Sequence, residues 1–197
     1  MTDIIERPVL TMPEAEADWL RSAYAEANVI LEYGSGGSTV MGAEMGEKTI
    51  FSVESDRKWA GMMQDWFDAN ETKSDVHIQP VWVGPTGKWG TPTKNETHGK
   101  WPKYPLKIWD LETFQHPDVV LVDGRFRTAC FLATLFRITK PVTLYFDDYI
   151  DREHYHMVED FVPRTETRGR MARFDLTPQV IKPENLLKII TEFAKKR

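Results

Sequence analysis

Residues 29–39 read Val-Ile-Leu-Glu-Tyr-Gly-Ser-Gly-Gly-Ser-Thr. The apolar run at 29–31 predicts a short buried strand, and the glycines after it (Gly34, Gly36 and Gly37) let the backbone bend sharply and come close to a ligand. The helix expected after this glycine turn presents its free N–H groups and the positive end of its dipole to that ligand. The stretch therefore predicts a strand, a turn and a helix that together bind a small molecule.

The spacing of the glycines distinguishes two kinds of site. A dinucleotide site follows the pattern G-x-G-x-x-G, whose third glycine falls here on Thr39. The pattern present is acid-x-Gly-x-Gly, in which Glu32 stands two residues before the first glycine. A second predicted strand ends in another acid, Glu54, eighteen residues after Gly36. In nucleotide-binding folds an acid at that position accepts hydrogen bonds from the ribose hydroxyls.

This pattern resembles the first motif of the class I S-adenosylmethionine (SAM)-dependent methyltransferases. The resemblance covers residues 11–150 well and implies a Rossmann-like fold that binds SAM. The residues that it assigns to the cofactor are Glu32, Gly34, Ser35, Gly36, Ser38, Thr39 and Glu54. Simpler roles stay open for the two acids: Glu32 as an acceptor that stabilises the turn, and Glu54 as a solvated strand end.

Strands and helices alternate along the rest of the chain. Beyond the strand at 49–54, we expect strands at 76–83, 118–123 and 142–146, helices at 126–138 and 151–161, a hairpin-like stretch at 164–176, and a C-terminal helix opened by Pro183. Thr11 and Glu14 predict a capping box, Asp56 predicts a helix cap, and Pro80 predicts an edge strand. Strands separated by helices form a parallel sheet. We expect an α/β fold: one Rossmann-like class I methyltransferase domain over residues 1–197, with a mostly parallel sheet and helices on both faces.

Composition excludes several classes of protein. The net charge of −5 and the lack of a long basic run argue against a nucleic-acid partner. The only cysteine, Cys130, lies in an apolar helical stretch and allows no disulfide within the chain. The sequence shows neither a signal peptide nor an apolar stretch long enough for a membrane span. We expect a cytoplasmic protein that acts on a small molecule, with its oligomeric state undecided.

One segment, 84–107, interrupts the alternation. It is rich in glycine and proline, yet it carries Trp89, Trp101 and Tyr104. Long irregular loops in compact domains are usually functional or disordered, and the aromatic residues argue against disorder. We interpret the segment as a lid-like insertion beside the substrate; a structural loop packed over the third strand is the alternative.

Acids and arginines gather at two further strand ends. Asp123 and Arg125 follow the fourth strand, and Asp147 and Asp148 follow the fifth. The carboxyl ends of neighbouring parallel strands are where open sheets bind ligands. We therefore predict Asp123, Arg125, Asp147 and Asp148 as catalytic residues.

The three aspartates also resemble the Mg²⁺ site of the metal-dependent catechol and macrocin O-methyltransferases. Three oxygen ligands suit Mg²⁺, which would chelate a vicinal diol. The resemblance is partial, because Phe126 stands where the catechol type has a lysine, and arginines flank it. Arg125 or Arg127 would instead neutralise the acids or bind an anionic substrate. We favour the arginines and assign no metal ligand.

These observations predict a SAM-dependent methyltransferase that acts on an oxygen of a small anionic or diol-containing substrate. Two alternatives remain: a non-catalytic SAM-binding or interaction protein, and an aminopropyltransferase-like enzyme. The usual acid pair of the latter is absent, because Gly124, Arg125 and Phe126 follow Asp123.

Overall fold

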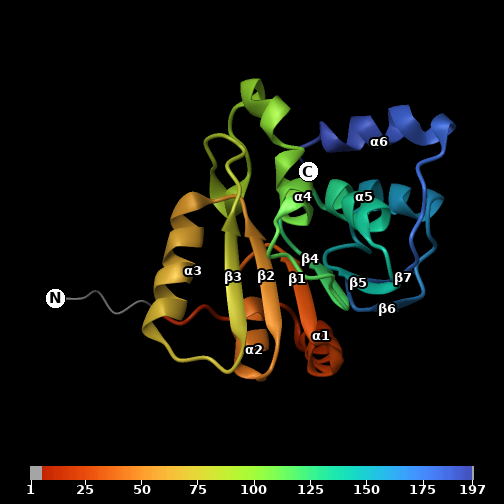
Figure 1. The fold of residues 1–197 in the computed structure, drawn as a ribbon. Coiled ribbons are helices and arrows are strands. Elements are labelled where there is room, and N and C mark those ends of the chain that lie inside the picture. Colours follow the sequence, from red (N-terminus) through yellow and green to blue (C-terminus); the bar gives the residue numbers. More distant parts are fainter. Residues whose placement is uncertain (1–5, 197) are drawn as a thin grey trace.

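A seven-stranded sheet forms the centre of the computed structural model, which describes residues 6–196 (Figure 1). The strand order is β3-β2-β1-β4-β5-β7-β6; the first five strands run parallel, and β7 and β6 run antiparallel to their neighbours. The strands are β1 (Val29–Tyr33), β2 (Thr49–Glu54), β3 (Asp75–Pro80), β4 (Val119–Val122), β5 (Val142–Phe146), β6 (Glu166–Arg168) and β7 (Met171–Leu176). The predicted α/β fold with a mostly parallel sheet is confirmed.

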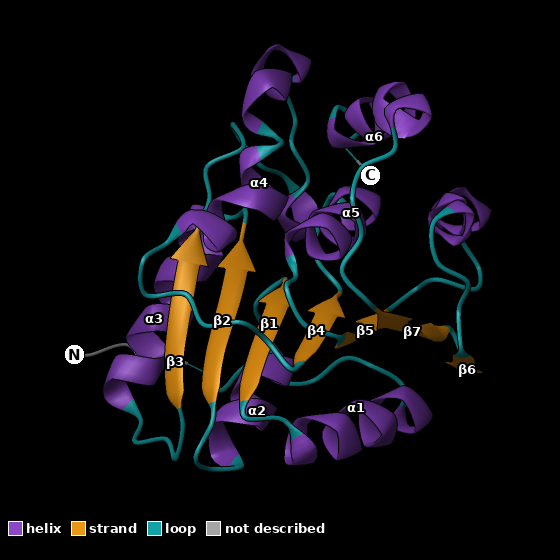
Figure 2. Cartoon of the chain, turned by 45° about the vertical axis from the view of Figure 1, so that its right-hand side comes forward, coloured by secondary structure: helices purple, strands orange, loops and turns teal. Residues whose placement is uncertain are grey.

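Helices cover both faces of the sheet (Figure 2). One face carries α1 (Glu14–Glu26), α2 (Gly37–Glu44) and α3 (Arg57–Ala69), and the other carries α4 (Lys103–Leu106) and α5 (Arg127–Arg137), with α6 (Leu186–Phe193) packed on α5. Alternate residues of a strand pack into the hydrophobic cores on opposite faces of the sheet: Leu31 packs on the α5 side, and Ile30 packs on the α1 side. Burial on both faces explains why the central strand β4 (Val-Val-Leu-Val) is an apolar run. Among the described residues, no helix has the length and apolar character needed to cross a bilayer.

Local predictions met different outcomes. Asp56 caps α3 as expected, since its carboxylate accepts hydrogen bonds from two backbone N–H groups of the first turn. The capping box predicted at Thr11 is wrong: α1 follows Pro13 without a side-chain cap. The strand predicted to reach residue 83 ends at Pro80, and it is an edge strand as that proline predicted. The helix predicted at 151–161 is a 3₁₀ segment, η4 (Glu153–Asp160).

The insertion at 84–107 is ordered around short helical turns. It contains η1 (Lys88–Gly90), η2 (Asn95–Lys100) and α4, and η3 (Lys107–Asp110) begins at its end. Trp101 and Tyr104 are buried, with ring centroids 5.8 and 5.4 Å from that of Phe126, whereas Trp89 is 72% exposed. Two of the three aromatic residues noted in this segment therefore belong to the hydrophobic core.

Candidate functional site

Two residues of the turn between β1 and α2 must be glycine, because the backbone conformation or a close backbone neighbour leaves no room for a side chain. Gly34 has a φ of 111°, and a Cβ there would lie 2.8 Å from the backbone of Gly124. A Cβ at Gly37 would lie 2.1 Å from the backbone nitrogen of Leu10. A Cβ at Gly36 would meet no atom within 4 Å. Gly34 and Gly37 thus let the chain pack on itself, and the side of Gly36 faces open space.

Glu32 lies beneath this turn and is fully buried. Its carboxylate accepts hydrogen bonds from the Tyr24 hydroxyl at 2.7 Å and the Thr39 hydroxyl at 2.5 Å. Thr39 in turn accepts a bond from the N–H of Gly36 at 3.0 Å. Burial raises the pKa of Glu32, while hydrogen bonds from Thr39, Tyr24 and Ser38 oppose that rise. Glu32 therefore holds the glycine turn in place, the simpler of its two expected roles.

Glu54 links the turn to the start of α3. Its Oε1 accepts hydrogen bonds from the N–H groups of Ser55 at 2.6 Å and Asp56 at 2.8 Å, and its Oε2 accepts one from Ser35 at 3.2 Å. Glu54 is 8% exposed, and burial raises its pKa although these hydrogen bonds oppose the shift. The insertion covers it, because the carbonyl of Gly90 accepts a bond from the Ser55 hydroxyl at 3.0 Å. Glu54 is thus not the solvated strand end of the alternative reading.

The three aspartates converge beside this turn. One carboxylate oxygen from each of Asp123, Asp147 and Asp148 lies within 4.8 Å of the others. Arg127 lies among them and is 3% exposed. Its guanidinium donates to an Asp123 carboxylate oxygen at 3.0 Å and to the Asp147 carbonyl at 2.6 Å, and it lies 3.2 Å from an Asp148 carboxylate oxygen. Arg127 therefore neutralises two of the three carboxylates, those of Asp123 and Asp148.

Two more arginines complete the neutralisation of the cluster. Arg170 donates to both carboxylate oxygens of Asp147, at 2.9 and 2.7 Å, and lies 3.2 Å from Asp148. Arg152 lies 2.7 Å from Asp148. Burial alone would raise the pKa of Asp147, but the hydrogen bonds and charge of Arg170, together with the charge of Arg127, outweigh burial and hold that pKa below its usual range. Because every carboxylate already faces a guanidinium, the cluster does not fit a divalent ion as it stands.

Arg125 stands apart from this network. Its Nη1 donates to the Thr91 hydroxyl at 3.3 Å, and its buried Nε has no hydrogen-bond partner among the described residues. A buried donor without an acceptor destabilises a fold, so such a group calls for an explanation. The expectation that Arg125 or Arg127 neutralises the aspartates thus holds for Arg127 alone.

The sequence predicted that Asp123, Asp147 and Asp148 lie close together, but it did not predict their two arginine partners, Arg152 and Arg170. Arg152 and Arg170 are contributed by segments after β5, and no local pattern marks either as a partner of Asp147 or Asp148. The only available signal was charge balance, since three adjacent carboxylates require nearby cations. Ser35 also makes a hydrogen bond, 2.8 Å long, with the hydroxyl of Ser52, which the motif did not indicate.

No protein-family model matches the chain, and no curated protein matches it. Among solved structures, a methyltransferase-like protein from Silicibacter pomeroyi is 53% identical, with 95% of this chain and 98% of that chain covered and a TM-score of 0.90. An O-methyltransferase from Bacillus cereus is 13% identical over 85% of this chain and 83% of its own, with a TM-score of 0.53. A methyltransferase from Geobacter sulfurreducens is 10% identical over 85% and 80%, with a TM-score of 0.51. The last two likenesses concern the fold alone. By its identity to the first, over nearly the whole of both, the chain belongs to the same family as this methyltransferase-like protein.

Proposed function

We propose that this chain transfers a methyl group from SAM to an oxygen of a small anionic acceptor, and that it does so in the cytoplasm. The observation that carries the proposal is the open space at Gly36 beside the carboxylate of Glu54. A ligand that enters there meets the amino end of α2 and a buried acid suited to ribose hydroxyls. The Bacillus cereus protein, which shares the fold, is in complex with S-adenosylhomocysteine (SAH).

On this proposal the glycine turn and Glu54 bind the cofactor, together with Ser35, Ser38 and Thr39. Glu32 acts as a positioning residue, because it is fully buried beneath the turn and bonded there to Thr39 and Tyr24. Oε2 of Glu54 accepts one N–H, at 3.2 Å, and retains capacity for a ribose hydroxyl. Bound SAM would supply an electrophilic methyl group on its sulfonium.

The acceptor side rests on Arg125 and Asp123. The unpartnered Nε of Arg125 suits a carboxylate or phosphate of the acceptor. Burial raises the pKa of Asp123 to about 7, with the Asp147 and Asp148 carboxylates adding to the rise and Arg127 opposing it. A carboxylate that titrates there is suited to accept the proton that an acceptor hydroxyl loses on methylation. Asp147 and Asp148 hold Arg127, which in turn orients Asp123.

The test uses the difference between the turn glycines. Gly36→Ala places a methyl group in the proposed ligand space without meeting a protein atom, so the unliganded melting temperature should stay within about 2 °C of wild type. SAH affinity, measured by calorimetry, should fall about tenfold or more, because the ligand can no longer approach the backbone. Gly61→Ala, which also meets no atom within 4 Å but lies in α3, is the matched control and should leave affinity unchanged.

The same experiment addresses the rival functions. No heat and no melting shift with about 1 mM SAM or SAH, for a folded wild type, would contradict the proposal, since a ligand at 100 times its dissociation constant stabilises by about 2.7 kcal/mol. A larger shift with decarboxylated SAM would favour the aminopropyltransferase. SAH binding without methyl transfer to any diol, carboxylate or phosphate acceptor would favour a binding protein. The contact between Gly90 and Ser55, which covers Glu54, is the observation that favours a function other than the proposed one.

A further inference from the structure

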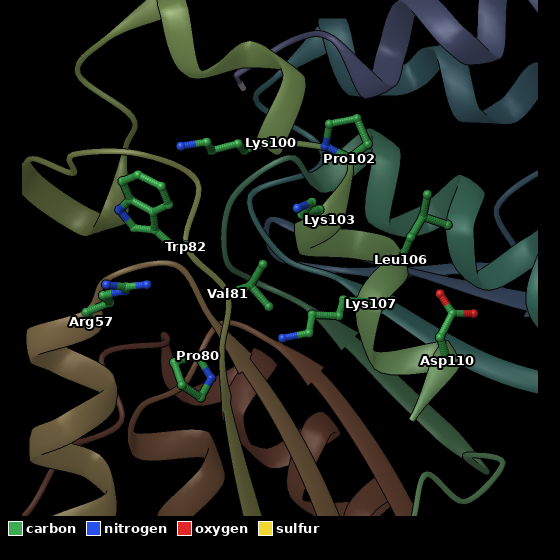
Figure 3. A pocket seen from close by; sticks show the side chains of 10 residues that line it. All are labelled: Arg57, Pro80, Val81, Trp82, Lys100, Pro102, Lys103, Leu106, Lys107 and Asp110. Carbon is green, nitrogen blue, oxygen red and sulfur yellow. The ribbon is translucent and has the colours of Figure 1, made fainter. Parts of the chain in front are cut away.

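A pocket of about 620 Å³ opens between the start of α3, the end of β3 and α4 (Figure 3). Four cationic side chains line it: Arg57, Lys100, Lys103 and Lys107. Figure 3 shows Arg57 and the two lysines of the α4 side, Lys103 and Lys107, on opposite sides of Val81. None of its lining residues belongs to the glycine turn or to the aspartate cluster.

The charge of this pocket is uncompensated within the described part of the chain. None of its four cations makes an ion pair there, whereas nine arginines elsewhere do. The only carboxylate of the lining, Asp110, is bound to Arg137 at 2.7 Å. In a chain whose net charge is −5, four unpaired cations around one cavity create a local positive potential that attracts anions.

One feature, the Trp82 ring, holds two of these cations in place. Arg57 is the first residue of α3, a position where the positive end of the helix dipole disfavours a cation. The Trp82 ring offsets that disadvantage, because the Arg57 guanidinium lies 5.3 Å and the Lys100 ammonium 3.4 Å from the ring centroid. Figure 3 shows Trp82 between these two side chains. The ring therefore orients two cations at one side of the pocket.

Apart from Asp110, the remainder of the lining is apolar. Val81 is buried at its base, and Pro80, Pro102 and Leu106 surround it. The volume lies within the range of small-ligand sites, about 300–1,000 Å³. Such a lining suits a ligand with a compact apolar body as well as charge. The cations are three ammonium groups and one guanidinium, and ammonium groups bind phosphate as point charges.

We propose that this pocket binds a small organic phosphate, whose phosphate oxygens meet Lys103 and Lys107 and whose apolar part rests on Val81 and Leu106, while Arg57 and Lys100 add positive potential from the other side of the pocket. A phosphate monoester carries about −1.5 to −2 charges at neutral pH, which begins to balance the four cations. The lining shares no residue with those proposed to bind SAM or the methyl acceptor, so the failure of this site and that of the proposed function are distinguishable.

Calorimetry with phenyl phosphate and with pyrophosphate tests the site on the full chain. Both probes should bind at about 50 mM salt, and both should weaken at least threefold at about 500 mM salt, where screening is strong. The double variant Lys103→Gln/Lys107→Gln should lose about tenfold or more for each probe, because it removes two charge-assisted contacts. The variant Lys140→Gln/Lys182→Gln makes the same charge change at exposed sites outside the pocket and should stay within about twofold of wild type.

Leu106→Ala tests whether the apolar part of the ligand contacts the pocket separately from its phosphate. It should weaken phenyl phosphate by about threefold and leave pyrophosphate unchanged, since only the former has an apolar body. Three results would each overturn the proposal: no binding of either probe at about 5 mM, equal losses in the two lysine variants, or tighter binding of a ten-nucleotide oligonucleotide than of phenyl phosphate through the same lysines. The second would mean a diffuse charge effect, and the third a nucleic-acid surface.

Discussion

Replacing Arg170 by glutamine removes the guanidinium that binds both oxygens of Asp147. The Asp147 side chain is fully buried, so its carboxylate would keep its burial and lose its main partner. Removing one partner of a buried ion pair destabilises a protein by about 3–5 kcal/mol. Arg170 is itself 32% exposed, and Arg127 remains nearby, so we expect about 2–3 kcal/mol. For a chain of this length that corresponds to a fall in melting temperature of about 5–10 °C.

The effect should depend on pH in a defined direction. In the wild type the pKa of Asp147 is lowered, so its contribution to stability is present above the unfolded-state pKa of about 4 and is lost as pH falls through the folded value. Without Arg170, burial dominates and raises this pKa. The difference in unfolding free energy between wild type and Arg170→Gln should therefore be largest near pH 7 and shrink as pH falls toward about 4.

Urea denaturation followed by circular dichroism, at about pH 7, 5.5 and 4.5, measures this difference. Arg173→Gln is the matched control, because Arg173 forms an exposed ion pair with Asp175 that contributes about 0–1 kcal/mol. Equal effects of the two substitutions at pH 7 would refute the reasoning, as would a difference that does not change with pH. A wild-type melting temperature that rises with Mg²⁺ and falls with a chelator would show that the arginines do not satisfy the cluster.

Three further predictions concern the insertion and Asp123. Trp101→Ala should destabilise the protein by about 3–5 kcal/mol in urea, because the ring is buried, whereas Trp89→Ala should change stability by less than about 0.5 kcal/mol. Amides of 84–107 should exchange hydrogen more slowly with SAH than without it; equal, strong protection in both states would make the segment a permanent part of the fold. If Asp123 is the proton acceptor, kcat/KM should rise with pH through about 7, and Asp123→Asn should abolish both the activity and the rise; an active Asp123→Asn variant with the same pH profile would exclude that role.

The sequence predicted those parts of the fold whose cause is local. Apolar runs marked the parallel strands because both faces of the sheet are covered, and Asp56 marked a helix start through its own cap. The box expected at Thr11 failed because Pro13 occupies the cap position of α1 without a side-chain donor or acceptor. The hairpin at 164–176 could be recognised, but its pairing with β5 could not, since sequence pattern does not specify a long-range partner.

The insertion shows a second limit. Trp89, Trp101 and Tyr104 look alike in sequence, yet one is exposed and two are buried. The difference comes from Phe126, which follows β4 and packs against both buried rings. Composition correctly argued against disorder, but only the tertiary contacts separate core residues from surface residues.

The position of Arg170 between β6 and β7 links the aspartate cluster to the antiparallel edge of the sheet. Arg170 lies in the turn between β6 and β7, and its backbone carbonyl also accepts the N–H groups of Tyr149 and Ile150 at 2.8 and 3.1 Å. Its own N–H is bound by Glu16 of α1 at 2.8 Å. The hairpin is thus held by two other segments before its guanidinium reaches Asp147. Loosening the hairpin would withdraw a charge from a fully buried carboxylate, so the antiparallel edge of the sheet has an electrostatic role at the candidate site as well as a structural one.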